Sequence, residues 1–376
     1  MIDLLPNEIL DLIGQWLDDE DLRAATMVCA LLRAIFLPIY LKRNEFSPGR
    51  NFISLKGLSK FRAFKSYHHF PLPPRYAYLS AIFSWEDTDT ELSCLAYALA
   101  QFPAGTFRSI TLYFTRYNLI HAEALNEFLA ASVPIQCKNL FIMALLPGKH
   151  HIDVPPVYTP MACNLTKLTI EGNLNHIPFQ PLLFGASEVL EELSLCSVQA
   201  TSTSFLWKTL LNTTTFPELR SFRTSEDMPL PLLLDFLSRH PKVSSLAIDV
   251  NTCNKTMPTD NIIKKVDLKS LKVISGPPLH IFAVLHSAFA APSLARLSLL
   301  LNHLPNMSIF PEVLKCLAFC QKVEAFQVTI PHRNCRASTQ TNNIFSDLQV
   351  SQSRHSRSHY SRLIIFFWMT MQVMRI

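Results

Sequence analysis

The first seventeen residues carry apolar side chains in a helical rhythm. Apolar residues recur at three- and four-residue steps: Leu5, Ile9, Leu12, Ile13, Trp16 and Leu17. This spacing predicts an amphipathic helix with one wide apolar stripe, and a stripe of that width must be buried somewhere. Pro6 suits the first helical turn, because its missing N–H would have no partner there.

Two further helices are expected within the first forty-five residues. The acidic run 18–21 interrupts the apolar pattern and places carboxylates at the start of a second helix, where the helix dipole favours negative charge. A third helix carries Leu31, Leu32, Ile35, Phe36, Ile39 and Tyr40. Pro38 should kink or divide it. Three short helices form a marginal core, so docking of an exposed apolar face on a partner is expected.

From about residue 107 a Leu-x-x-Leu-x-Leu pattern recurs nine times. Its segments are Phe107-Ile110-Leu112, Cys137-Leu140-Ile142, Leu165-Leu168-Ile170, Leu190-Leu193-Leu195, Leu219-Phe222-Thr224, Val243-Leu246-Ile248, Leu268-Leu271-Val273, Leu294-Leu297-Leu299 and Val323-Phe326-Val328. Successive segments begin 24 to 30 residues apart. Repeats of roughly 20 to 29 residues with this pattern are typical of strand-and-helix solenoids.

Helical patterns separate these predicted strands, for example in residues 119–129, 206–211, 232–237, 281–289 and 313–318. The alternation predicts an α/β fold, with parallel strands on the concave face and helices on the convex face. A non-repetitive α/β domain, with leucines at this spacing by chance, is the alternative.

The segment that begins Leu4-Leu5-Pro6-Asn7-Glu8-Ile9-Leu10 and ends at Val28-Cys29 resembles an F-box. An F-box packs against the Skp adaptor of the cullin-based SCF ubiquitin ligase. The resemblance therefore implies a helical scaffold and adaptor contact at Leu5, Pro6, Ile9, Leu10, Ile13, Leu17, Leu22 and Val28. Periodicity does not decide which of these side chains face inward. An ordinary helical cap on the following domain is the alternative interpretation.

The repeats resemble a degenerate leucine-rich-repeat domain, of the kind that often follows an F-box. Residues on a strand alternate between its two faces, so those between the buried leucines should project from the concave surface. We expect target binding there, at Tyr113, Phe141, Lys167, Glu171, Arg223, Asp249, Lys272 and Arg296. Mixed charge with two aromatic residues suits a protein epitope better than a nucleic acid.

The chain divides into four predicted parts. These are an F-box at 1–45, a helical connector with a Pro-rich joint at 46–80, the repeat domain at 81–331, and a tail at 332–376. The tail is polar and basic with a short apolar end, and we expect it to be disordered or an artefact of the gene model. Its apolar end has about a dozen residues, whereas a membrane-spanning helix needs about 20. We therefore do not expect a membrane anchor.

Composition narrows the function. Of 376 residues, 49% are hydrophobic and 17% charged, which excludes a largely disordered protein. The net charge of +5 is scattered and argues little for nucleic acid. The nine cysteines fit reduced thiols in the cytoplasm or nucleus, since no secretory leader is evident.

Catalytic motifs are missing from the sequence. The eight glycines form no phosphate-binding loop and no nucleophile elbow. His68-His69 and His150-His151 are adjacent pairs, which would not share a helix face, and Cys316 and Cys320 lack the partners of a metal site. We expect no metal, no cofactor and no enzymatic activity.

The two resemblances together imply a substrate-recognition subunit of an SCF-type ubiquitin ligase. The N-terminal helices would bind the Skp adaptor, and through it the cullin, while the repeat sheet would select an unknown protein target. The alternative is a non-catalytic repeat scaffold without a role in ubiquitination.

Overall fold

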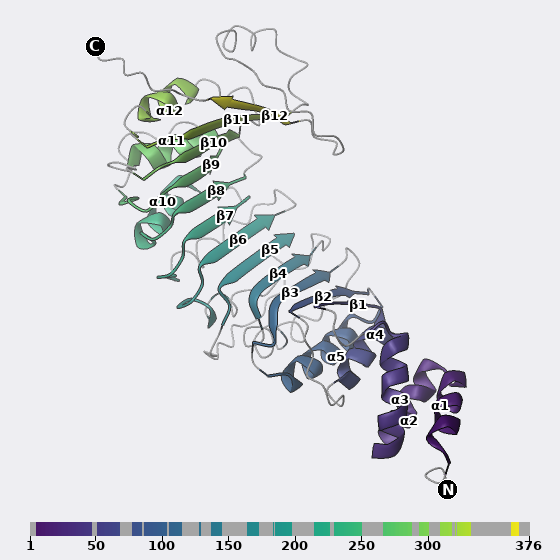
Figure 1. The fold of residues 1–376 in the computed structure, drawn as a ribbon. Helices are drawn as coiled ribbons and strands as arrows, with labels where there is room; N and C mark the ends of the chain where they lie inside the picture. The colour runs from purple at the N-terminus through teal and green to yellow at the C-terminus, as the bar shows by residue number, and fades with distance from the viewer. Residues whose placement is uncertain are drawn as a thin grey trace. The chain divides into compact units, whose positions relative to one another are not determined.

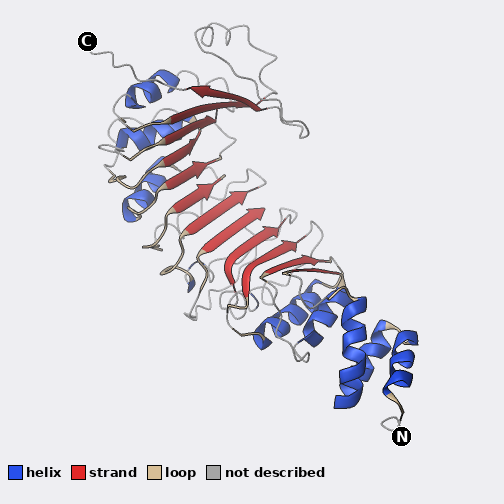
Figure 2. Cartoon of the chain, viewed as in Figure 1, coloured by secondary structure: helices blue, strands red, loops and turns tan. Residues whose placement is uncertain are grey.

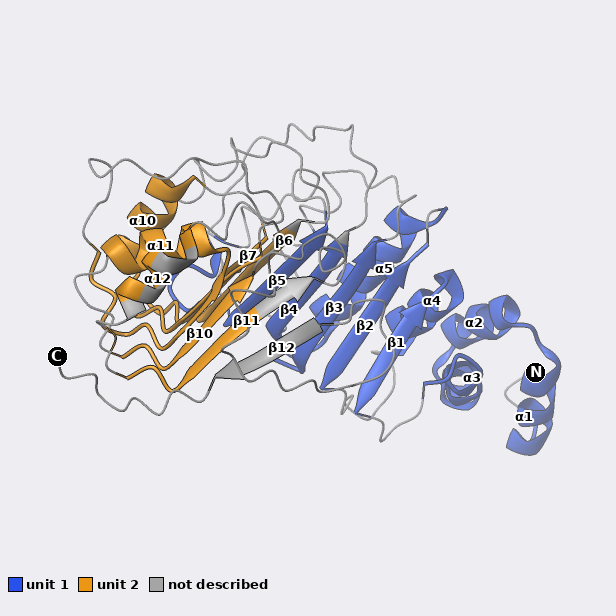
Figure 3. Ribbon diagram, turned by 90° about the horizontal axis from the view of Figure 1, so that it is seen from above, with its two compact units in different colours: residues 1–189 blue, residues 190–376 orange. Residues whose placement is uncertain are grey.

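The computed structural model describes residues 5–46, 51–67, 77–84, 86–103, 105–114, 128, 137–144, 164–172, 183, 185–197, 214–225, 229–249, 266–287, 293–300, 309–317, 320, 322–331 and 362–367. Within the chain, contacts cluster into two compact units, 1–189 and 190–376. Figure 3 colours them separately, and each is described here by itself.

Unit 1 begins with three helices, as the apolar pattern predicts (Figure 1). They are α1 (Asn7–Trp16), α2 (Asp19–Val28) and α3 (Ala30–Arg43). Asp18 caps α2, since its Oδ1 accepts a hydrogen bond of 2.8 Å from the Asp21 N–H. Pro38 lies inside α3 without dividing it, contrary to one of the two expected outcomes.

Five strands of unit 1 form a parallel sheet in which each strand pairs with the next along the chain. In chain order the elements are β1 (Phe52–Lys56), α4 (Leu58–Ser66), β2 (Tyr78–Phe83), α5 (Thr88–Gln101), β3 (Phe107–Phe114), β4 (Cys137–Ala144) and β5 (Lys167–Gly172). The sheet thus begins inside the segment 46–80, which the sequence pattern predicts to be a helical connector. A run as short as Phe52–Lys56 fits the helical period as well as the strand period. In the structure Ile53 and Leu55 are buried alternately, as in a strand.

Unit 2 continues the same alternation of strand and helix (Figure 2). Its described elements are β6 (Glu192–Ser197), β7 (Ser221–Thr224), α10 (Leu230–Arg239), β8 (Ser245–Ile248), β9 (Val273–Gly276), α11 (Pro278–Ser287), β10 (Arg296–Leu300), α12 (Phe310–Leu317), β11 (Ala325–Pro331) and β12 (Arg362–Phe367). Strands β6 to β11 are parallel, and β12 pairs antiparallel with β11. The tail, expected to be disordered or artefactual, thus contributes a strand at 362–367, and its other residues lie outside the described ones.

The cores lie between the strands and the helices. In unit 1 Phe61 of α4 stacks on Phe83 of β2, with ring centroids 5.3 Å apart, and Phe83 stacks on Phe114 of β3 at 4.6 Å. In unit 2 Phe222 of β7 meets Phe236 of α10 at 4.7 Å. Alternate strand residues therefore point to the helices, and the others form an uncovered sheet face among the described residues.

All nine predicted strands are present, but the register is wrong at one of them. The pattern Leu268-Leu271-Val273 suggests a strand with Leu271 and Val273 buried. Instead β9 runs from Val273 to Gly276, and Ile274 pairs with Leu246 and Leu297 of the neighbouring strands. Leu271, Ile274 and Gly276 fit the spacing equally well, and only strand pairing separates the two choices.

The helices expected at 232–237, 281–289 and 313–318 correspond to α10, α11 and α12 over their described residues. Of the pattern at 119–129 only Phe128 is described, and the pattern at 206–211 lies outside the described residues. The α/β class with parallel strands is therefore confirmed, in a form compatible with a solenoid.

Candidate functional site: an apolar face on the N-terminal helices

Helix α1 packs on α3 through a close approach at Gly14. A Cβ atom at this position would lie 2.8 Å from Cδ1 of Ile39 and 2.9 Å from Cδ1 of Phe36, closer than carbon atoms normally come. Leu10, one turn earlier on the same side of α1, is also buried. Gly14 and Leu10 therefore define the inward face of α1.

The opposite face of α1 is apolar and exposed. Ile9, Leu12, Ile13 and Trp16 recur along it, Leu5 lies just before the helix, and the Trp16 side chain is 90% exposed. At the end of α2, Met27 and Val28 are also exposed, by 62% and 71%. Seven of the eleven large hydrophobic side chains that are exposed in the described chain thus lie within residues 5–28. We call these seven side chains the N-terminal apolar face.

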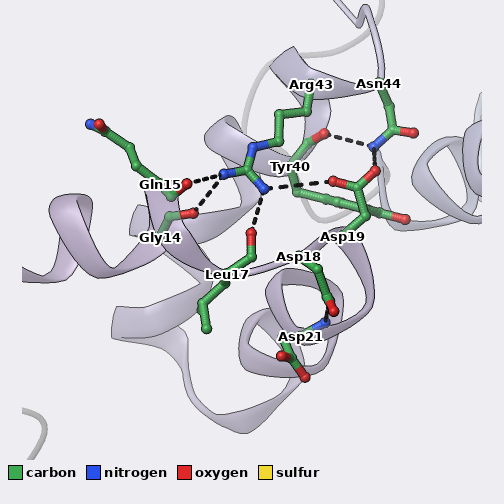
Figure 4. A network of polar contacts seen from close by, with 9 residues as sticks. All are labelled: Gly14, Gln15, Leu17, Asp18, Asp19, Asp21, Tyr40, Arg43 and Asn44. Carbon is green, nitrogen blue, oxygen red and sulfur yellow. Dashed lines mark hydrogen bonds and ion pairs between the residues drawn. The ribbon is translucent and has the colours of Figure 1, made fainter.

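Arg43 holds the end of α1 in place from the end of α3 (Figure 4). Its guanidinium donates to the carbonyl oxygens of Leu17, at 2.5 Å, Gly14, at 3.1 Å, and Gln15, at 2.6 Å. The last carbonyls of a helix have no partner within it, so one planar guanidinium satisfies several of them. The Arg43 Nη1 also lies 3.8 Å from Oδ1 of Asp19.

The acidic turn is a structural joint. Asn44 Nδ2 donates to Oδ2 of Asp19 at 3.3 Å and to the Tyr40 carbonyl at 3.0 Å (Figure 4). Tyr40 is buried below this network, and burial raises its pKa to about 12, so its phenol stays protonated at neutral pH. The network fixes α1 and α2 on α3 and leaves the N-terminal apolar face outside it.

The eight residues expected to make the scaffold and adaptor contact divide into two groups. Leu10 and Leu22 are buried in the helical core, and Leu17 is half-buried. The exposed members are Leu5, Pro6, Ile9, Ile13 and Val28. Leu12, Trp16 and Met27 belong to the exposed face but are missing from the predicted set. The stripe contains Leu12 and Trp16, yet it is too wide for periodicity alone to show which side packs on α3.

Seven of the eight residues expected to bind the target lie on the sheet faces that point away from the helices, whose positions we call the outward rows. They are Tyr113, Phe141, Lys167, Glu171, Arg223, Asp249 and Arg296, and Asp249 follows directly after β8. Lys272 is misplaced, because the register of β9 leaves it one residue before the strand. The outward rows also contain Ile82 and Met143, which the repeat pattern does not single out.

Two pairs on the outward rows interact across neighbouring strands. The Tyr113 and Phe141 rings lie 6.0 Å apart between β3 and β4. In unit 2, Arg223 Nε lies 2.7 Å from Oδ2 of Asp249. Two charged side chains that were expected to contact the target thus pair with each other inside unit 2.

The described residues contain no group of three or more side chains suited to hold a metal ion. Cys320 Sγ donates to the Cys316 carbonyl at 3.7 Å, and burial raises the pKa of both thiols, which disfavours the reactive thiolate. Glu91 is fully buried in α5, where its Oε2 accepts a 2.7 Å hydrogen bond from the Ser84 N–H, and burial raises its pKa. His68-His69 and His150-His151 lie outside the described residues.

Among the described helices, none has the length and apolar character to cross a membrane. No model of a known protein family matches the chain. No curated protein sequence is significantly similar to it either.

Proposed function

We propose that the protein is a substrate-recognition subunit of an SCF-type ubiquitin ligase. In this proposal α1, α2 and α3 are an F-box that binds the Skp adaptor, and the strand-and-helix units are degenerate leucine-rich repeats that bind the target. The protein works in the cytoplasm or nucleus and supplies no catalytic group of its own.

The N-terminal apolar face carries the proposal. The helical module is packed on its inner side and exposes Ile9, Leu12 and Trp16 on its outer side. Such an exposed apolar surface is typical of a site that binds another protein. Aromatic and aliphatic side chains of this kind are the usual energetic centres of protein interfaces. The Leu-Pro-x-Glu-Ile motif and the acidic turn resemble those of an F-box, which is why we propose the Skp adaptor as the partner.

The mechanism is proximity. A receptor that binds ligase and target together holds target lysines near the charged ubiquitin enzyme, which raises their effective concentration without new chemistry. The adaptor contact comes from α1 and α2, and the target contact comes from outward sheet positions such as Tyr113 and Phe141.

The test measures binding of the full chain to purified Skp adaptor by calorimetry. The double variant Ile9→Asp, Ile13→Asp places two charges on the N-terminal apolar face without touching the inward Leu10 and Gly14. We expect at least a hundredfold loss of affinity, since each buried unpaired charge costs several kcal/mol.

The matched control is Ala34→Asp, which adds a carboxylate at an exposed position of α3, where no large apolar side chain is exposed. It should bind like the natural chain, and circular dichroism should show that all variants remain helical. A folded natural chain that fails to bind the adaptor would reject the proposal and favour a repeat scaffold without a ubiquitin role.

A further inference from the structure

One outward row of the unit 1 sheet joins five strands in strict register. Lys56 pairs with Ile82, Ile82 with Tyr113, Tyr113 with Met143, and Met143 with Glu171. A positive charge therefore stands at one end of the row, a negative charge at the other, and three uncharged, largely apolar side chains between them.

These side chains face away from the helices. Their strand neighbours Ala81, Phe83 and Phe114 are buried on the helix side, where Phe83 stacks on Phe61 of α4. Strand residues alternate, so Ile82 and Tyr113 point the other way and remain partly exposed. The Tyr113 ring also leans on Phe141, which widens the apolar strip across β3 and β4.

Charge is absent from the middle of this face. Nine alternating outward positions of β2, β3 and β4 are uncharged: Tyr78, Ser80, Ile82, Ser109, Thr111, Tyr113, Asn139, Phe141 and Met143. Among the described residues, Arg108 and Lys138 are exposed at the starts of β3 and β4, and the remaining charged side chains of this sheet stand on the flanking strands β1 and β5. An uncharged centre rich in aromatic residues and Met, with a charged rim, is the usual composition of a protein interface.

The outward face of unit 2 differs. Its central charges, Arg223 on β7 and Asp249 after β8, form an ion pair with each other at 2.7 Å. Ala247, which pairs with Arg223 in register, is small. This face therefore offers neither a large apolar anchor nor an uncommitted charge at its centre, which is why we place target binding on unit 1.

The spacing of the row sets the length of its ligand. Neighbouring strands are about 4.8 Å apart, so Lys56 and Glu171 are separated by about 19 Å over four steps. An extended peptide advances about 3.3 Å per residue and covers this distance in about six residues. We propose that the row Lys56, Ile82, Tyr113, Met143 and Glu171 binds an extended peptide segment that crosses the strands. The segment has an acidic and a basic residue about six positions apart, with apolar residues between them.

This inference rests on the proposed function, since it names the class of target for the same receptor. The probe is a displayed library of random 16-residue peptides, selected on the immobilised full chain. We expect enriched peptides with one acid and one base about six residues apart around an apolar centre. The double variant Tyr113→Ser, Met143→Ser should reduce their capture at least tenfold, whereas Arg223→Ser, a change on the unit 2 face, should not.

A single charge change makes the test sharper. Lys56→Glu turns both rims of the row negative, so peptides selected on this variant should carry basic residues at both ends. Enriched peptides that show no such change would overturn the proposal. Charges spaced about thirteen residues apart would also overturn it, because a helix that rises 1.5 Å per residue would then be the ligand.

Two further outcomes would reject the inference. One is a library without any enriched peptide, and the other is a sheet variant that alters the oligomeric state in sedimentation, which would make the face an interface between copies of this chain. Adaptor binding is measured in parallel on the same variants. A natural chain that selects no peptide but binds the adaptor rejects only this inference, and a natural chain that selects peptides but does not bind the adaptor rejects only the adaptor-binding role.

Discussion

His240, at the end of α10, shows how one buried side chain ties two segments of unit 2 together. Its Nε2 accepts a hydrogen bond of 2.9 Å from the Phe216 N–H, so Nδ1 carries the proton and donates to the Phe236 carbonyl at 2.6 Å. The ring stacks on Phe216 and packs at a tilt against Phe236. Burial, with a smaller effect of the Arg239 charge, lowers the pKa of His240. A protonated ring would point an N–H at the Phe216 N–H.

The first prediction is that His240 makes the stability of unit 2 depend on pH. Its pKa in the folded state lies below the unfolded value of about 6.5, so its contribution to the free energy of unfolding is complete above pH 6.5. It declines as the pH falls from there through the folded pKa, because the unfolded chain takes up the proton first. Urea unfolding at pH 7.5 and 5.5 should show a loss of stability at the lower pH that is smaller in His240→Gln.

The control for this prediction is His286→Gln. His286 is an exposed histidine at the end of α11 that stacks on Phe282. This change should leave the pH dependence of the natural chain intact. An equal loss of stability at pH 5.5 in His240→Gln and in the natural chain would show that other groups cause it.

At the scale of elements, the contact of α1 with α3 decides which side of α1 faces outward. The second prediction is that Gly14→Leu pushes α1 away from Ile39 and Phe36, since even a Cβ atom has no room there. The overpacked variant should lose about 1–3 kcal/mol of unfolding free energy. Equilibrium urea unfolding, followed by helical circular dichroism, measures this change.

Gln15→Leu provides the matched comparison, because it adds a leucine at the next position of α1, where the side chain is exposed. It should change the unfolding free energy by less than about 0.5 kcal/mol. If both leucine variants were equally stable, the close approach of α1 and α3 would not exist in solution.

Across unit 1 as a whole, the joint between the helices and the sheet depends on Phe46. Helix α3 ends in a Schellman turn, in which the Phe46 N–H bonds to the Leu41 carbonyl at 2.9 Å and Glu45 takes a left-handed conformation, with φ 65°. The turn directs Phe46 onto α4, where its ring stacks on Phe64 at 6.2 Å.

The third prediction follows from this joint. Phe46→Ala should lower the unfolding free energy of unit 1 by about 3–5 kcal/mol, because a buried aromatic ring leaves a cavity. Glu45→Gln removes the charge of the partly exposed ion pair with Lys60 and should cost less than about 1 kcal/mol. Thermal unfolding ranks the two variants, and a larger effect of Glu45→Gln would show that charge, not packing, holds the joint.

Sequence periodicity alone determined most of the elements, although not β1, β2 and β12. The helical rhythm of residues 5–17 predicts α1, and the nine Leu-x-x-Leu-x-Leu segments predict nine strands, because side-chain alternation is a property of the local backbone. The acidic turn was likewise predictable as a helix-joining turn, since Asp18 acts as a cap within its own helix.

Tertiary structure decided which side of each element is used. Only the approach of α3 to Gly14 turns Leu10 inward and leaves Trp16 exposed. Only strand pairing moves Lys272 off β9, and only the register aligns Lys56 with Glu171 across five strands. A wide apolar stripe and a repeated Leu spacing are each compatible with several pairings, and contacts between residues far apart in the chain select one of them.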